Sequence, residues 1–165
     1  MARSTVVPIL PHGRILPDPR KLKRAVENSL TGTAKAIKID YDVTTQTWSN
    51  RPPFTIITER WYERLITTES KVYLYVTGGT RPHTIRPVNA PALRFQWGGP
   101  GSYQAKTAPR VVASRAGGPS GPIVYRQEVH HPGTEARKFE VVISDKWRKQ
   151  WPTVLSRAIA SEMVF

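Results

Sequence analysis

The sequence predicts an α+β fold in which an antiparallel β-sheet meander is flanked by an N-terminal and a C-terminal helix. Short runs of alternating apolar residues, separated by turn residues, are typical of strands. A helix-start signal stands near each end of the chain. The 165 residues suffice for one domain with its own core. We expect that domain to span 18–165, preceded by an extended arm at 1–17 and interrupted by a long loop at 98–122.

The arm is predicted from its prolines. Pro8, Pro11 and Pro17 disfavour both a helix and a central strand, and apolar residues fill the positions between them. An arm with this much apolar surface should dock, either on its own domain or on a neighbouring subunit.

The first predicted helix begins at Asp18-Pro19, because a carboxylate can cap free N–H groups and proline fits the first helical position. Leu22, Val26 and Leu30 fall on one face of this helix. We expect it to end near Thr31-Gly32, or to bend there and continue for one turn.

The strands are predicted from alternation and β-propensity. The segment 36–43 alternates apolar and polar residues, and 54–58 is expected to pair with it as an antiparallel strand. The segment 59–70 fits either a short helix or an irregular link. Further strands are expected at 71–76, 85–88, 93–97, 123–129 and 139–143. Ser144-Asp145 then caps a final helix, kinked or restarted near Pro152.

The loop at 98–122 is rich in glycine and proline and contains no acidic residue. Such a composition buries too little surface to order itself, so alone the loop should be mobile. We therefore expect another chain to hold it in place.

Charge and composition limit the function. The net charge is +13, which favours a polyanion or an acidic protein surface as partner. The stretch 70–127 has no Asp or Glu but carries eight cations, namely Lys71, Arg81, Arg86, Arg94, Lys106, Arg110, Arg115 and Arg126. The absence of cysteine excludes disulfides, thiolate nucleophiles and cysteine zinc sites. No apolar run has the length of a membrane span, so we expect a soluble intracellular product without a membrane partner.

Histidines are the chemical candidates, since His83, His130 and His131 all lie at two turns that could meet in space. Three imidazoles could bind a metal, and a histidine pair with an arginine could cleave RNA. However, neighbouring residues of a strand point to opposite faces, and no carboxylate stands near His83 in the sequence. The favoured interpretation is that these histidines pack the turns, and we expect no catalytic residue, metal or cofactor.

Two segments carry a family resemblance. The stretch 75–85 (YVTGGTRPHTI) and the stretch 131–139 (HPGTEARKF), with Leu93-Arg94-Phe95 and 103–107 (YQAKT) between them, resemble the small tail-component or neck proteins of tailed bacteriophages. The resemblance covers roughly residues 45 to 160 and leaves the arm outside it.

The resemblance implies a structural virion protein that is made in the host cytoplasm and located at the head–tail junction of the virion. It would form a homo-oligomeric ring, as the neck or tail-completion protein or as the tail terminator, beside connector, portal-side and tail-tube proteins. The family motif implies turn-shaping roles for Gly79, Thr80, Pro82, His83, Pro132, Gly133, Thr134, Arg137 and Phe139.

The basic stretch could face neighbouring acidic rings or passing double-stranded DNA, which it would contact non-specifically. The residues expected on that basic interaction face are Arg94, Lys106, Arg110 and Arg115. The alternative from another class is a basic nucleic-acid-binding module, and a phosphodiesterase built on His83 and His130 comes third.

Overall fold

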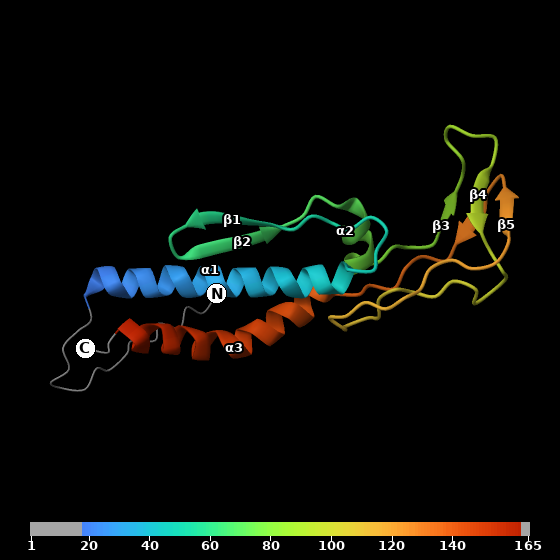
Figure 1. Ribbon diagram of the computed structural model, residues 1–165. Helices are drawn as coiled ribbons and strands as arrows, with labels where there is room; N and C mark the ends of the chain where they lie inside the picture. The colour runs from blue at the N-terminus through green and yellow to red at the C-terminus, as the bar shows by residue number, and fades with distance from the viewer. Residues whose placement is uncertain (1–17, 163–165) are drawn as a thin grey trace.

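The computed structural model describes residues 18–162, and the arm at 1–17 lies outside them. The described part is an α+β fold with a helix at each end, which confirms the predicted class. Its elements are α1 (Pro19–Thr45), β1 (Thr55–Arg60), β2 (Glu63–Thr67), α2 (Lys71–Gly78), β3 (His83–Ile85), β4 (Leu93–Gln96), β5 (Ile123–Arg126), β6 (Val129–His131) and α3 (Phe139–Glu162). Helices α1 and α3 run alongside each other in opposite directions, and the β1–β2 hairpin lies on α1 (Figure 1).

Helix α1 begins as predicted but is much longer than predicted. The Asp18 carboxylate accepts a hydrogen bond from Arg20 N at 2.8 Å, and Pro19 occupies the first turn. The helix then passes through Gly32 and continues over the segment 36–43, which was wrongly predicted as a strand. Three threonines fit the helix because each hydroxyl donates to the carbonyl four residues earlier, namely Thr31 to Glu27, Thr44 to Asp40 and Thr45 to Tyr41.

The core is small and lies where α1, α2, α3 and the hairpin meet. Its buried members are Phe54, Tyr73, Phe139 and Ile143. The Phe54 ring stacks on Tyr41 at a centroid distance of 4.9 Å and meets Tyr73 edge-on at 5.2 Å. These aromatic contacts hold α2 and the start of β1 against the C-terminal half of α1.

Asp40 ties the two long helices together. Its carboxylate accepts hydrogen bonds from Lys146 Nζ at 2.7 Å and from Trp147 Nε1 at 2.7 Å, both on α3. The Asp40 side chain is mostly buried, so these bonds satisfy a charge that would otherwise be costly to desolvate.

The β1–β2 hairpin contradicts two predictions, the pairing of 54–58 with 36–43 and the helix or irregular link at 59–70. Strand β1 pairs with β2, which occupies the segment for which we expected a helix or an irregular link, and no strand of the described residues runs at 36–43 for β1 to pair with. The two residues of the turn are Trp61 and Tyr62. Arg64 stabilises this turn, because its Nη1 donates to the carbonyls of Arg60, Trp61 and Glu63.

Two segments predicted as strands are helical. Lys71–Gly78 forms α2, which Ser70 caps by accepting a hydrogen bond from Tyr73 N at 3.3 Å. Phe139–Ile143 is the first turn of α3, so this helix begins before Ser144-Asp145, and Pro152 lies inside it. The Thr77 hydroxyl joins the two helices, since it accepts from Phe139 N at 3.2 Å and donates to Glu140 Oε2.

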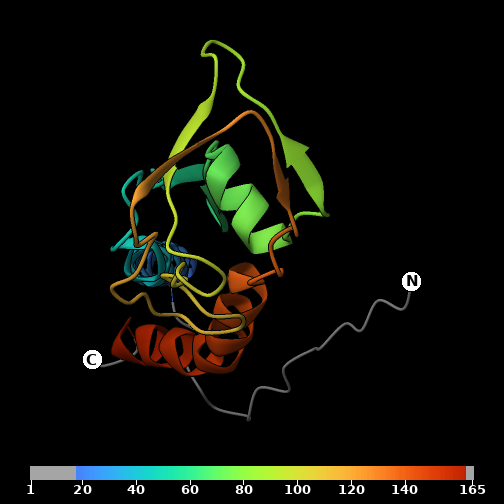
Figure 2. The same cartoon turned by 90° about the vertical axis from the view of Figure 1, so that its right-hand side faces the viewer.

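The remaining strands form a tip at the far end of the molecule rather than part of one meander. Strand β3 pairs only with β6, and β4 pairs only with β5, so the described residues contain three separate two-stranded sheets. Figure 2 looks onto this tip, where both ladders stand away from α1 and α3. A single sheet does not form because the segments 71–76 and 139–143, which were predicted as strands of it, belong to the helices α2 and α3.

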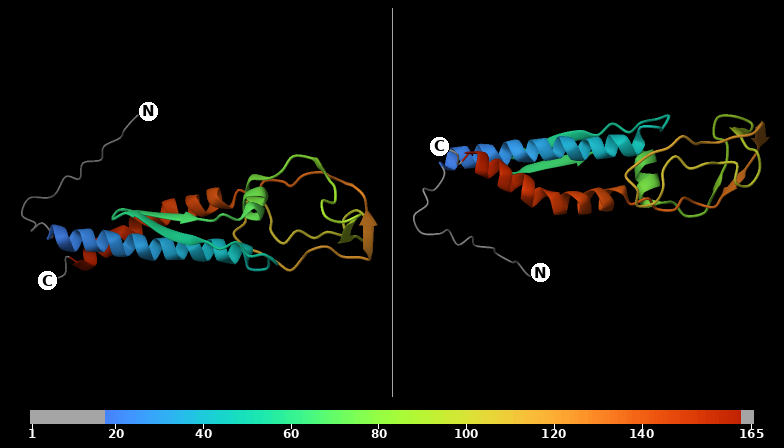
Figure 3. Two further views of the ribbon diagram at one scale, coloured as in Figure 1. Left: turned by 90° about the horizontal axis from the view of Figure 1, so that it is seen from above. Right: turned by 60° about the horizontal axis from the view of Figure 1, so that its bottom comes forward.

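The loop at 98–122 is bonded to its own chain, and the expectation that another chain holds it stays a prediction. Lys106 Nζ donates to Thr47 O at 2.8 Å, and Ser114 Oγ donates to Val43 O at 3.0 Å, so the loop binds carbonyls at the C-terminal end of α1. Gln104 and Gly118 form an isolated β-bridge within it, and Val112 packs against the core. Figure 3 shows the loop running from the tip back toward α1.

Among residues 18–162, the helices are all too short or too polar to cross a bilayer.

Candidate interaction surface

The two turn segments that carry the resemblance lie side by side. Thr80 N donates to Thr134 O at 2.9 Å, and Thr134 N donates back to Thr80 O at 3.1 Å. One step further along, β3 and β6 pair in register, with His83 opposite His131. Residues about fifty positions apart thus form one structural unit at the base of the tip.

Glycine is required at two positions of this unit. Gly79 has φ +75°, and a Cβ there would lie 2.7 Å from Thr134 O. Gly133 has φ +91°, and a Cβ there would run into the backbone of Thr80 and Arg81. Both residues therefore combine a left-handed conformation with a close backbone approach, for which a side chain leaves no room.

The other motif residues divide into anchors and exposed positions. Arg137 N donates to Val76 O at 3.1 Å, and Phe139 is completely buried in the core. Pro82 and Pro132 are exposed on the two turns. The anchors fix the second turn to α2, while the prolines leave the outer surface of the unit open to solvent.

The three histidines do not converge on one site. The His83 and His131 rings lie 5.1 Å apart, and each Nδ1 is engaged by nearby backbone: His83 donates to Arg81 O and His131 accepts from Gly133 N. His130 points elsewhere, with its Nδ1 3.1 Å from Thr84 Oγ1 and its Nε2 3.3 Å from Glu128 Oε1. Within 18–162, no group of three or more metal-binding side chains is arranged around a common point.

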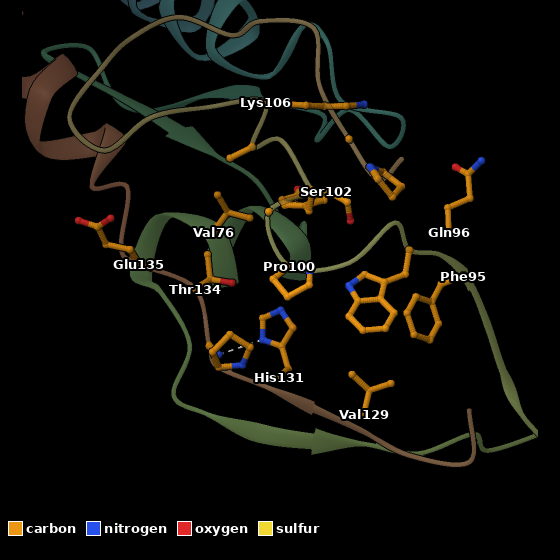
Figure 4. Close-up of a pocket in the computed structure, with 18 of the residues that line it drawn as sticks. Val76, Phe95, Gln96, Pro100, Ser102, Lys106, Val129, His131, Thr134 and Glu135 are labelled. Carbon is orange, nitrogen blue, oxygen red and sulfur yellow. Dashed lines mark hydrogen bonds between the residues drawn. The ribbon is translucent and has the colours of Figure 1, made fainter. Parts of the chain in front are cut away.

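A large open hollow of about 1140 Å³ lies between the tip, the loop at 98–122 and α2. Phe95, Val129, His131 and Pro100 face into it (Figure 4). Arg137 also lines the hollow, and its buried Nε has no hydrogen-bond acceptor among the described residues. The hollow therefore offers apolar walls and one guanidinium N–H that lacks an acceptor.

The predicted basic face is divided between two places. Lys106 and Arg115 are neighbours in the loop, where Arg115 N donates to Lys106 O at 2.9 Å, and the Lys106 ammonium is used to bind Thr47 O. Arg110 is exposed in the same loop. Arg94 stands on β4 in the tip, opposite Tyr125. The structure thus leaves Arg94 exposed in the tip and Arg110 and Arg115 exposed in the loop, and gives Lys106 a structural hydrogen bond.

The chain exposes more surface than a compact monomer of its size. A folded protein of 18.6 kDa should expose about 8,200 Å², whereas this chain exposes 12650 Å². The residues outside 18–162 could account for at most about 3,300 Å² as an extended chain. The described part then still exceeds by roughly a quarter the ~7,500 Å² expected for its own length.

Exposed apolar side chains account for part of this excess, and many of them lie at the two ends of the molecule. At the tip, Val88 is 92% exposed and Tyr125 is 60% exposed. At the opposite end, Trp61 and Tyr62 form an exposed edge-to-face pair at the hairpin turn. Exposed apolar patches of this kind are typical of interaction surfaces.

The hollow was not predicted from the sequence. Its apolar walls come from Phe95 and Val129 on strands that belong to different ladders, and from Pro100 in the loop. Strand patterning marked 93–97 and 123–129 as strands but could not show that 123–126 pairs with β4 while Val129 belongs to the other ladder. The available signal was the expectation that the two turns carrying His83, His130 and His131 could meet in space.

No family model matches the chain, and neither a curated protein nor a solved structure resembles it closely enough to count as a match.

Proposed function

We propose that this protein is a structural virion subunit of a tailed phage, which forms a ring in the head-to-tail connector as the neck or tail-completion protein. The observation that carries the proposal is the tip, where two separate two-stranded ladders extend away from the core. A two-stranded ladder is marginally stable in water by itself. Contacts from a neighbouring copy would supply the support that the tip lacks.

The arrangement of the exposed surfaces favours a ring or another closed assembly of identical subunits. Apolar side chains are exposed at the tip and at the hairpin turn, which lie at opposite ends of an elongated molecule (Figure 1). A contact between two different surfaces of the same chain is heterologous, and it generates a ring when the rotation closes. The unpaired Arg137 Nε–H in the hollow would then donate a hydrogen bond to a carbonyl or carboxylate oxygen of the neighbour.

The phage assignment rests on the resemblance of the two turn segments, which supports a neck protein and equally the tail-terminator ring at the top of the tail tube. The net charge of +13, with exposed Arg94 and Arg110, suits a ring through which DNA passes. The same charge is the observation that favours the second candidate function, a basic nucleic-acid-binding module.

Mass measurement by light scattering tests the proposal on the purified protein and on isolated virion necks. We expect a discrete ring, or a monomer that is found as a ring only in the virion. A protein that stays monomeric and is absent from virions would contradict the connector function. Binding of that monomer to any DNA duplex, weakening steeply with salt, would then support the nucleic-acid-binding module.

A further inference from the structure

A groove of about 580 Å³ lies between α1, β2 and α3, on the helical body and away from the hollow. Its floor and walls are apolar and aromatic, and they include Ile37, Tyr41, Leu65, Ile66, Trp147 and Trp151. Leu65 remains 45% exposed although it faces this groove. The described residues thus leave an aromatic groove open that no side chain of theirs fills.

The walls of the groove are held in place by polar contacts. The Trp147 indole donates from Nε1 to Asp40 Oδ2 at 2.7 Å, and this fixes the orientation of its ring. Arg64 and Arg148 lie at the rim, and Arg64 is bound to the carbonyls of the hairpin turn. A preformed aromatic groove of this kind loses little entropy when an extended segment binds.

The sequence of the N-terminal arm has the chemistry that such a groove binds. Residues 4–11 (STVVPILP) carry no charge, and Pro8 and Pro11 form a P-x-x-P pattern with Ile9 and Leu10 between them. Proline-rich segments of this type favour the polyproline II conformation, and aromatic-lined grooves recognise it. The neutral, apolar composition also suits a groove whose charged residues are confined to the rim.

The length of the arm places this motif at the groove. Ile37 lies 18 residues beyond the start of α1 at Pro19, which at 1.5 Å per residue is about 27 Å along the helix. A polyproline II chain rises about 3.1 Å per residue, so about nine residues span that distance. Counting back from Pro17, the ninth residue is Ile9, and Val6 and Val7 then lie near Tyr41.

We propose that residues 6–11 dock in the groove between α1, β2 and α3 of their own chain, as a polyproline II segment that packs Ile9 and Leu10 against Leu65 and Trp151. The occupant is the chain's own arm rather than a neighbour's, because the arm is long enough to reach. The proposal does not depend on the ring or on the phage assignment, since it concerns a contact within one subunit.

Site-specific photocrosslinking on the full chain tests this docking. Ile9 is replaced by p-benzoylphenylalanine, the dilute protein is irradiated, and the crosslinked residue is identified by peptide mass spectrometry. We expect crosslinks to Leu65, Trp147 or Trp151 within a single chain. As a control, the same label at Arg14 should miss the groove, because by the same estimate it lies along the first turns of α1.

The variant Leu65→Lys distinguishes docking in the groove from chance proximity. Leu65 is exposed, so the change should leave the circular dichroism spectrum unchanged, while a charge at the contact should lower the crosslinking yield from position 9 at least tenfold. An unchanged yield, or crosslinks that map outside the groove, would overturn the proposal. Covalent dimers at low concentration would also overturn it, because the occupant would then be the arm of another copy.

Discussion

At the residue scale, Gly133 leaves less room for a side chain than Gly79, the other left-handed glycine of the turn motif. It has φ +91°, and a Cβ there would lie 3.0 Å from Arg81 C and 3.1 Å from Pro82 N, with Thr80 O closer still. Gly133→Ala should therefore lower the free energy of unfolding by more than ~1 kcal/mol, because it adds a steric clash to the cost of the left-handed conformation. Urea denaturation measures this loss.

Gly99→Ala is the matched control for that substitution. Gly99 also has a positive φ, +104°, but no atom lies within 4 Å of the position that a Cβ would take. Its substitution should cost only the conformational term of roughly 1 kcal/mol. Equal losses at the two positions would contradict the close approach of the two turns.

Tyr73 makes stability depend on pH in the alkaline range. Burial raises the pKa of its phenol above the ordinary value of 10.0, and the neighbouring Tyr41 and Glu140 raise it further. The fold therefore keeps the phenol protonated where the unfolded chain ionises it. Its contribution to stability is complete below about pH 10 and is lost as the pH rises above that value. Urea unfolding at about pH 8 and about pH 11 should show this loss.

Two tyrosine variants assign that loss to Tyr73. Tyr73→Phe removes the ionising group, so the stability of this variant should fall less steeply with pH than that of the wild type. Tyr103 is exposed in the loop at 98–122, and Tyr103→Phe should leave the slope unchanged. If Tyr73→Phe retained the full slope, another group would be responsible.

At the element scale, β4 and β5 of the tip were predicted, whereas the strand expected at 85–88 shares only Ile85 with β3 and β6 was not predicted as a separate strand. Three helical segments were taken for strands. The segment 36–43 alternates apolar and polar residues, and 71–76 and 139–143 are short runs rich in β-branched and aromatic residues, and both features are typical of strands. The residues that are buried in the last of these segments, Phe139 and Ile143, instead stand four apart and share one helix face, while Val141 between them is exposed. Contact with the core decided between the two periods, and a single sequence does not contain that information.

The two ends of α1 show which helix boundaries local sequence signals can predict. The Asp18-Pro19 start depends only on neighbouring residues, so the sequence predicted it correctly. The continuation past Gly32 depends on packing against α3 and the hairpin, which lie far away in the sequence. For the same reason the basic face was predicted as one surface, although Arg94 belongs to the tip and Lys106 binds the end of α1.

Gly32 provides a direct test of this helix. It lies inside α1, and a Cβ added there meets no atom within 4 Å. Gly32→Ala should raise the free energy of unfolding by ~0.5–1 kcal/mol, because alanine loses less backbone entropy in a helix. Thermal denaturation measures the change. If the helix ended at Gly32, which was one of the two predicted alternatives, the glycine would serve as a cap and alanine would destabilise the protein.

At the scale of the whole molecule, the described residues form a helical body that contains the core and a tip of short two-stranded ladders. The body contains the whole buried aromatic core, and α1 and α3 are joined through Asp40. The tip consists of short ladders with exposed faces, and all three residues of β3 are exposed. A chain built this way can keep its fold through the body while the tip remains available to a partner.

The separation of the core in the body from the exposed tip predicts how a charge at the tip affects assembly. Tyr125 on β5 is exposed and far from the core, so Tyr125→Asp should leave the melting temperature of the subunit nearly unchanged. In an interface between copies, the same carboxylate would be desolvated without a partner, and we expect assembly to weaken at least tenfold, about 1.4 kcal/mol. Light scattering in solution, and the amount of protein recovered in virions, measure this effect.

Gln150→Asp is the control, because it adds the same charge at an exposed polar position of α3 and should assemble normally. Normal assembly of Tyr125→Asp would exclude the tip from the interface, whereas failure of both variants would show that net charge, rather than the tip, controls assembly.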